Sequence, residues 1–356
     1  MNREYNDNKM YNSALDELRF SDEAKSRMVN RLMAAAEQPE QPVAIHRVRR
    51  FPRIAAVGVA AALVLSIGAG ATGVFKSASD AFAGVFGPTA DTEIIDQIGH
   101  PIGASDTAGG VTVTADAILF DGYNYLISYT LEKEDGSAFD CTKNPDTGLL
   151  DLNWADANSD IGLFGGAIGN SYFYDADPND NAIQYVETRS FDDAVKVGGT
   201  AKIKLHDLQE FSNDSTKSTL VKGTWSLKFK LDAGNSAKEL PAGQNLTVNG
   251  MNATVDKLVI SPIGYNFTYT VAEQAKFEDA PSGKAPQSQR DTWDAFSVPL
   301  SVTLKDGTVI DLNSTSGSME PDNGETVCTR MGTFDTILPL DEVASVTIGD
   351  TTIPVK

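Results

Sequence analysis

The sequence predicts a mainly β protein, in which two tandem β-sandwiches follow one transmembrane helix and a short helical cytoplasmic segment. Three observations lead to this fold class. A long run without charged residues occupies positions 54–75, alternating polar and apolar stretches between turn residues fill the chain beyond position 90, and one such stretch occurs twice. Together they divide the 356 residues into segments 1–53, 54–75, 76–90, 91–232 and 233–356.

The first segment predicts two short amphipathic helices. Apolar residues recur at helical spacing in two groups, first Met10, Leu15 and Leu18 and then Met28 and Leu32. The prolines of "EQPEQPVA" end the second helix and lead to the membrane. Helices this short are marginal in water, so we expect their apolar faces to bind a partner protein. A disordered tail with nascent helicity is the alternative.

Residues 54–75 predict a permanent membrane anchor. The run has no charged side chain, and as a helix it would extend roughly 33 Å, enough to cross the hydrocarbon core of a bilayer. Four arginines precede it, namely Arg47, Arg49, Arg50 and Arg53, whereas Lys76 and Asp80 follow it. This asymmetry places the N-terminus in the cytoplasm and the rest of the chain outside the cell. Cleavage as a signal peptide near Ala81-Phe82-Ala83 is the alternative, although a polar segment of 53 residues comes first.

The anchor is rich in small residues, with Gly68, Gly70 and Gly73 in its second half. Such a helix either unwinds readily, which makes an intramembrane protease a candidate partner, or packs closely against another helix.

The juxtamembrane segment predicts a short helix over Ser77–Gly87, with Phe82, Val85 and Phe86 on one side. Its apolar side could lie on the outer leaflet.

Charge is distributed unevenly along the chain. Residues 1–53 hold ten Lys+Arg and eight Asp+Glu, so 19 basic and 41 acidic residues remain and give the chain beyond the anchor a net charge of −22. Nucleic acids and anionic lipids need basic surfaces, so we expect neither to bind there.

An internal repeat organises the predicted strands. "GVTVTADAILFDGYNYLISYT", from Gly110, returns as "GMNATVDKLVISPIGYNFTYT", from Gly250, with Asp116 matching Asp256 and Tyr123-Asn124 matching Tyr265-Asn266 across a two-residue insertion. Four later stretches alternate in the same way: "TAKIKLHDL", "GTWSLKFKLD", "LSVTLKDGTVIDL" and "VASVTIGDTTIPV". The last two contain the hairpin turns Asp306-Gly307 and Gly349-Asp350. Duplication of an immunoglobulin-like sandwich of about a hundred residues accounts for this pattern.

The first predicted sandwich carries an irregular insertion between about Cys141 and Tyr185. Its aromatic residues either form a contact patch or plug the end of the sandwich; they are Trp154, Tyr172, Phe173 and Tyr174. Two stretches, "DANSDIG" and "DADPNDN", resemble calcium loops but lack the required Gly and Glu, so we expect Asp- and Asn-rich turns instead.

The sequence offers no recognisable catalytic or metal chemistry. His46, His100 and His206 lie in different segments without metal-ligand spacing, and no nucleophile motif or phosphate-binding loop occurs. We therefore expect no enzyme activity, no cofactor and no metal. Cys141 and Cys328 fall in different predicted sandwiches, so we expect them to be unpaired, with a bridge between the sandwiches as the alternative.

Several stretches resemble a family. "FSDEAKSRMVNRLM", the anchor, "AFAGVFG", "IIDQIGHPIG" and "GVTVTADAILFDGYNYLISYTL" resemble a domain-of-unknown-function family of single-pass proteins from Gram-positive bacteria. The tail, "MNATVDKLVISPIGYNFTYTV" with "GTFDTILPLDEVASVTIGD", is similar to the immunoglobulin-like domain often appended to it. Members are commonly encoded beside extracytoplasmic-function sigma factors and are regarded as their anti-sigma factors.

The resemblance implies that the cytoplasmic helices sequester a sigma factor while the sandwiches sense or shield at the cell surface. A surface adhesin or ligand-binding protein, whose cytoplasmic tail only sets the topology, is the alternative from another functional class.

Overall fold

The computed structural model describes residues 76–87, 90–161, 167–195, 198–211, 217–232, 234–277, 286–312 and 316–355. The predicted cytoplasmic helices and the predicted anchor lie outside these ranges. Among the helices that are described, none has the length and apolar character needed to span a membrane.

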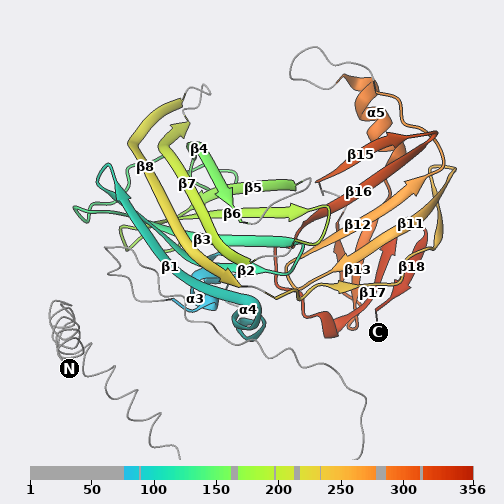
Figure 1. The fold of residues 1–356 in the computed structure, drawn as a ribbon, viewed down its shortest axis with the longest axis horizontal. Coiled ribbons are helices and arrows are strands. Elements are labelled where there is room, and N and C mark those ends of the chain that lie inside the picture. Colours follow the sequence, from blue (N-terminus) through green and yellow to red (C-terminus); the bar gives the residue numbers. More distant parts are fainter. Residues whose placement is uncertain are drawn as a thin grey trace, which may run out of the picture. The chain divides into compact units, whose positions relative to one another are not determined.

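The prediction of a mainly β fold is confirmed. We call the strands from residue 99 to residue 232 the first β unit and those from residue 238 to residue 354 the second β unit. The first comprises β1 (Gly99–Ala108), β2 (Val111–Phe120), β3 (Asn124–Lys133), β4 (Leu152–Asp160), β5 (Ala167–Tyr174), β6 (Ile183–Phe191), β7 (Gly198–Phe211) and β8 (Lys217–Asp232). One sheet has the order β1-β2-β3-β6-β5, and a second, β4-β7-β8, packs across it (Figure 1).

The second β unit also has two main sheets. Its elements are β9 (Lys238–Glu239), β10 (Asn245–Val248), β11 (Met251–Ile260), β12 (Gly264–Val271), α5 (Gln287–Phe296), β13 (Leu300–Leu304), β14 (Val309–Asp311), β15 (Ser316–Asp322), β16 (Glu325–Thr333), the 3-10 turn η1 (Leu340–Glu342), β17 (Val343–Ile348) and β18 (Thr351–Pro354). The sheets have the orders β10-β11-β12-β16-β15 and β14-β13-β17-β18, and β9 pairs with β11.

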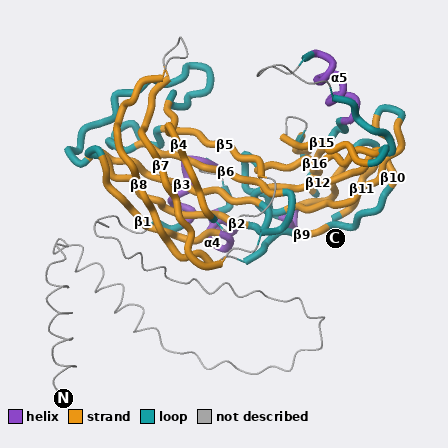
Figure 2. The backbone as a smooth tube through the Cα atoms, turned by 45° about the horizontal axis from the view of Figure 1, so that its top comes forward, coloured by secondary structure: helices purple, strands orange, loops and turns teal. Residues whose placement is uncertain are grey.

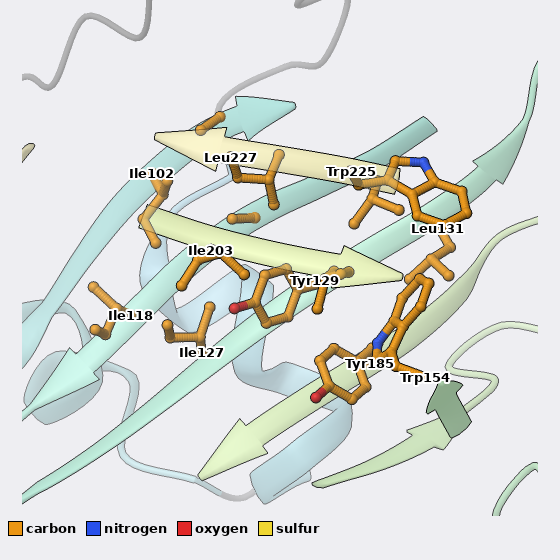
Figure 3. Close-up of a cluster of buried hydrophobic side chains, with 14 of the residues drawn as sticks. Ile102, Ile118, Ile127, Tyr129, Leu131, Trp154, Tyr185, Ile203, Trp225 and Leu227 are labelled. Atoms are coloured by element: carbon orange, nitrogen blue, oxygen red, sulfur yellow. The ribbon is translucent and has the colours of Figure 1, made fainter. Parts of the chain in front are cut away.

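The core of the first β unit lies between its two sheets. Apolar side chains of β2 and β3 face those of β7 and β8, and Trp154, Tyr185 and Trp225 pack among them (Figure 3). Trp225 is fully buried, and its indole Nε1 crosses between the sheets to donate to the carbonyl of Val111 at 2.9 Å. A bond from indole to backbone satisfies the one polar atom that burial of this ring would otherwise leave unpaired.

The duplication predicted from the sequence appears in the strand order. The order β1-β2-β3-β6-β5 has the same connectivity as β10-β11-β12-β16-β15, and β4-β7-β8 corresponds to β13-β17-β18. Both repeats carry a bulge at the same place, where Asp116 and Asp256 fall out of register. Each of these aspartates accepts a hydrogen bond from the next strand, Asp116 from Thr130 and Asp256 from Thr270.

The predicted two-residue insertion in the second repeat is wrong. Ala115 pairs with Tyr129 and Val255 with Tyr269, while Phe120 pairs with Tyr125 and Ile260 with Tyr265. The offset between the repeats is therefore a constant 140 residues, the same separation as between Asp121 and Ser261. The turn 121–124 corresponds to the turn 261–264. Tyr125, and not Tyr123, therefore occupies the position in the first repeat that Tyr265 occupies in the second.

Two further expectations are corrected within the first β unit. The insertion between Cys141 and Tyr185 is not irregular, because it contributes strands β4 and β5. Residues 156–160 of "DANSDIG" lie on β4 and not in the expected turn. The predicted turn at "DADPNDN" is confirmed, since Asp177 accepts a hydrogen bond from the backbone of Asn179 and Asp180 accepts one from that of Ala182.

Two of the four aromatic residues of this insertion belong to the core of the first β unit. Trp154 and Phe173 are 4% and 2% exposed, and their rings lie 5.7 Å apart, while Tyr172 and Tyr174 are half-buried. Trp154 and Phe173 therefore do not belong to an exposed contact patch, whereas Tyr172 and Tyr174 stay partly exposed with their ring centroids 6.0 Å apart.

Local features of the second β unit also differ from expectation. Helix α5 was not predicted; its sequence is polar on average, and Phe296 is its buried residue. The two-residue turn at Gly349-Asp350 is confirmed, but Asp306-Gly307 lies in a longer loop because β13 and β14 pair only as far as Thr303 and Val309.

Candidate functional site

The strongest candidate site is the place where the chain enters the β fold and where the two β units meet. We call it the junction: helices α3 (Ala78–Phe86) and α4 (Thr92–Ile98), the outer face of the β1-β2-β3-β6-β5 sheet, and the turns 121–124 and 261–264. Figure 2 shows the helices, in purple, against this sheet.

Helix α3 begins and ends with strong local signals. The side chain of Ser77 caps its N-terminus by accepting from the backbone N–H of Asp80 at 3.0 Å, and Asp80 favours the positive end of the helix dipole. Gly87 ends it in a left-handed conformation with φ +77°, which glycine adopts without strain.

Helix α4 holds α3 in place. The carboxylate of Asp96 accepts hydrogen bonds from the backbone N–H and from the hydroxyl of Ser79, at 2.8 and 2.9 Å. Gly99 follows α4, and a Cβ there would lie 2.3 Å from the Cβ of Ala78, so only glycine lets the two helices approach this closely.

The apolar side of α3 is buried in protein, which contradicts the expectation that it lies on a lipid leaflet. Phe82 is fully buried and Phe86 is 7% exposed. They belong to a third hydrophobic cluster that contains residues of α3, α4, β2 and β3 together with Ile263 and Ile337 of the second β unit. The packing of α3 therefore depends on both β units at once.

The outer face of β2 is apolar because of the bulge at Asp116. Before the bulge Val113 and Ala115 face the inner core, and after it Ile118 and Phe120 do so. The extra residue shifts the alternation by one position and directs Ala117 and Leu119 outward, onto α3 and α4.

Asp116 itself lies close to Lys76, which precedes α3. Lys76 donates to Thr130 at 3.1 Å and lies 3.8 Å from the Asp116 carboxylate. Burial raises the pKa of Asp116, and the positive charge of Lys76 partly offsets that effect.

At the centre of the junction the two equivalent turns hydrogen-bond to each other. The carboxylate of Asp121 is fully buried and accepts from the backbone N–H groups of Tyr123 and Asn124 at 2.6 and 2.5 Å. Its second oxygen accepts from the Asn124 amide at 2.8 Å and from the hydroxyl of Ser261. Ser261 in turn accepts from the backbone of its own turn, at Ile263 and Gly264.

Polar contacts on both sides of the turns complete the interface. The Asn266 amide donates to the carbonyls of Phe191 and Asp192 at 2.7 and 3.0 Å. Lys257 also donates to the carbonyl of Asp192 and lies over the ring of Tyr123, 5.6 Å from its centroid. The contacts are hydrogen bonds to buried backbone and side-chain atoms, so they define one docking geometry and not a sliding surface.

The side chains of the junction form a structural hydrogen-bond network. Throughout the described ranges, no group of three or more His, Cys, Asp or Glu side chains is placed to hold a metal ion. Both cysteines are free, and burial raises the pKa of Cys328 to about 11. What the arrangement can do is mechanical: it links the chain at residue 76 to both β units through one shared core.

The residues that the sequence predicts to bind a partner or to set the topology lie outside the described residues. These are Met10, Leu15, Leu18, Met28, Leu32, Arg47, Arg49, Arg50 and Arg53. The junction was not predicted, although its two turns, "DGYN" and "SPIG", were visible at equivalent places in the repeat. An Asp or Ser that starts a turn of this kind is a signal for side-chain capping of the backbone, but not for contact between two turns.

Comparison with known proteins supports part of the family resemblance. Residues 47–133 match the model of a domain of unknown function, DUF4179, a range that ends with the last residue of β3. A solved structure described as the conserved domain protein from Bacillus anthracis is similar at 17% identity, covering 73% of this chain and 80% of that chain, with a TM-score of 0.48. No curated protein matches the chain.

Substitution of Gly264 tests the contact between the turns. A Cβ at this position would lie 2.5 Å from the carbonyl of Gly332 and 2.6 Å from the amide nitrogen of Asn124. We expect Gly264→Ala to lower the free energy of unfolding by about 1–3 kcal/mol through overpacking. Gly234→Ala is the control, because nothing lies within 4 Å of a Cβ there, and it should change stability by less than about 0.5 kcal/mol. Equal urea midpoints for the two variants would contradict close contact of the turns.

Asp121 gives the junction a defined pH dependence. Burial raises its pKa more than the bonds from Ser261 and Asn124 lower it, so the folded state binds more protons than the unfolded state above the unfolded pKa of about 4. The free energy of unfolding of the wild type, relative to Asp121→Asn, should therefore fall as pH rises from 4 to 7.

The pH experiment has an internal control. The pKa of Asp306 is lowered by the backbone N–H of Thr308, so the wild type relative to Asp306→Asn should change with pH in the opposite direction. Urea unfolding at three pH values measures both differences. If the free energy of unfolding of the wild type relative to Asp121→Asn stays constant or rises with pH, the pKa of Asp121 is not raised in the folded state.

Proposed function

We propose that this protein is a single-pass, membrane-anchored anti-sigma factor. Residues 54–75 form the anchor, the arginines before it keep the N-terminus in the cytoplasm, and the two β units, which we interpret as immunoglobulin-like sandwiches, lie outside the cell. The apolar stripe formed by Met10, Leu15, Leu18, Met28 and Leu32 covers the polymerase-binding surface of an extracytoplasmic-function sigma factor.

One observation carries the proposal over the adhesin alternative. The predicted anchor ends at Phe75, and three residues later Ala78 is 2% exposed and part of the core that both β units share. No spacer separates the predicted anchor from the β fold, so any rearrangement of the β units acts at once on the end of the anchor. A flexible linker would uncouple the β units from the anchor, whereas a direct connection transmits their movement to it.

The junction also supports control by proteolysis. Proteases cleave extended, accessible chain, and the helical residues 78–86 have their apolar side buried between sheet and turns. Cleavage near the anchor would require the junction to open first. Opening would then expose the cut site, and an intramembrane protease acting on the small-residue anchor would free the cytoplasmic segment with its sigma factor.

The adhesin alternative loses part of its support. It relied on an exposed aromatic patch, but Trp154 and Phe173 belong to the core of the first β unit.

Capture of the sigma factor tests the function directly. We expect a sigma factor to co-purify with the full-length chain from membranes of its native cell, and to be lost from a Leu15→Asp/Leu32→Asp variant because two charges enter the apolar stripe. Asn12→Asp/Asn30→Asp adds the same charges on the polar sides of the same predicted helices and should retain it. Mass spectrometry reads the result. Recovery of no sigma factor, or its loss from both variants, contradicts the proposal.

Labelling of a native thiol tests the topology independently. Cys141 is free and half-buried, whereas Cys328 is 1% exposed. If the β units lie outside, a membrane-impermeant maleimide at pH 8 should label intact cells that make the wild type and not those that make Cys141→Ser. Labelling that appears only after lysis would place the β units inside and exclude the proposed topology.

A further inference from the structure

A charged pair lies inside the first β unit, away from the junction. Glu187 and Arg189 stand on the face of β6 that Tyr185 and Phe191 direct into the core. Directly opposite Glu187 on β3 is the fully buried Ile127. Only the carboxylate of this pair is buried, and burial of a carboxylate is costly unless it is paired and hydrogen-bonded.

A cavity of about 340 Å³ opens beside this pair. It is lined by Ala157 of β4, by residues 169–171 of β5, and by Tyr185, Glu187, Thr188 and Arg189 of β6. Its volume is at the lower end of the range for small-molecule sites, which is roughly 300–1,000 Å³.

The carboxylate of Glu187 is already saturated. It accepts from the hydroxyls of Ser159 and Tyr125 at 2.6 and 2.7 Å, from Tyr129 at 3.3 Å, and from Arg189 Nε at 3.3 Å. A carboxylate has about four acceptor positions, and four donors occupy them. Glu187 therefore serves to orient Arg189 and has no capacity left for a ligand.

Arg189 is the charged side chain in the cavity wall that is accessible to a ligand. Its side chain is 33% exposed although Glu187 beside it is 5% exposed. Only Nε bonds to Glu187, and the Tyr125 hydroxyl lies within reach of the guanidinium, which has five N–H donors in all. Donors thus remain for a ligand, on a planar group whose position the buried carboxylate holds.

Gly169 leaves space in the cavity next to the side chain of Arg189. A Cβ at this position would lie 3.4 Å from Arg189 Nε, 3.5 Å from Arg189 Cδ and 3.0 Å from the carbonyl of Thr188. Any larger residue would reduce the space above the guanidinium. Asn170 and Ser171, the next residues of β5, add small polar side chains to the same wall.

We propose that this cavity binds the carboxylate group of a small organic ligand, with Arg189 as the binding residue and Glu187 as its positioning residue. A guanidinium fork matches a carboxylate in shape and charge. The strong net negative charge of the chain favours a ligand with one negative charge over a phosphate with two. The carboxylate can come from the C-terminus of a peptide or from an acidic sugar, and this site does not depend on the proposed sigma-factor function.

The test is calorimetric titration of the purified full-length chain at low salt. N-acetylglycine represents a peptide C-terminus and glucuronate an acidic sugar, while N-acetylglycinamide and glucose are their neutral counterparts. We expect at least one acid to bind at least tenfold more tightly than its neutral counterpart, and the acid that binds identifies the source.

Variants locate the binding. Arg189→Gln should weaken binding of the acid at least tenfold, and Arg290→Gln, which removes an exposed arginine on α5, should not change it. Gly169→Ala should also weaken it without altering charge, so the proposal stays testable if Arg189→Gln fails to fold. Binding of neither acid, equal binding of acid and neutral compound, or equal binding by wild type and Gly169→Ala overturns the proposal.

Discussion

The hydrogen bond between two equivalent hairpin turns, supported by the bonds inside each turn, is the constraint on which the rest of the structure depends. Asp121 in one turn is fully buried and accepts from its own turn and from Ser261 of the other. A buried carboxylate that loses a donor costs several kcal/mol, so the two β units have one favoured way to dock. That docking brings Ile263 and Ile337 to the cluster that buries α3, and so fixes the entry of the chain.

The two repeats share a topology but have different interiors. Ile127 pairs with Glu187 in the first β unit, and its equivalent Phe267 pairs with Arg330 in the second. Arg330 is 6% exposed and stacks on the ring of Trp293 from α5, 5.7 Å from the centroid. The two β units therefore share one topology. The equivalent inner position is the Glu187 carboxylate beside a cavity in the first β unit and the Arg330 guanidinium against helix α5 in the second.

Much of the fold could be predicted from local pattern. The strands of "GVTVTADAILF" and "YNYLISYTLE", the hairpin turn at Gly349-Asp350 and the repeat itself follow from residue alternation and turn chemistry, which act over a few neighbours. The candidate sites could not be predicted in this way. Asp121 and Ser261 are 140 residues apart. Glu187 accepts hydrogen bonds from Ser159 and Tyr125, which lie on two other strands. Neither cluster can therefore be recognised in a short stretch of sequence.

Residue alternation and turn chemistry are enough to predict the mainly β class and the equivalence of the two halves, because backbone propensity and side-chain alternation are local properties. Which faces are buried follows from the pairing of strands in the folded protein. The bulge at Asp116 shifts the alternation by one residue, turns Ala117 and Leu119 outward, and gives α3 an apolar sheet to cover instead of a membrane surface. Such a shift depends on pairing with a neighbouring strand, which sequence periodicity does not contain.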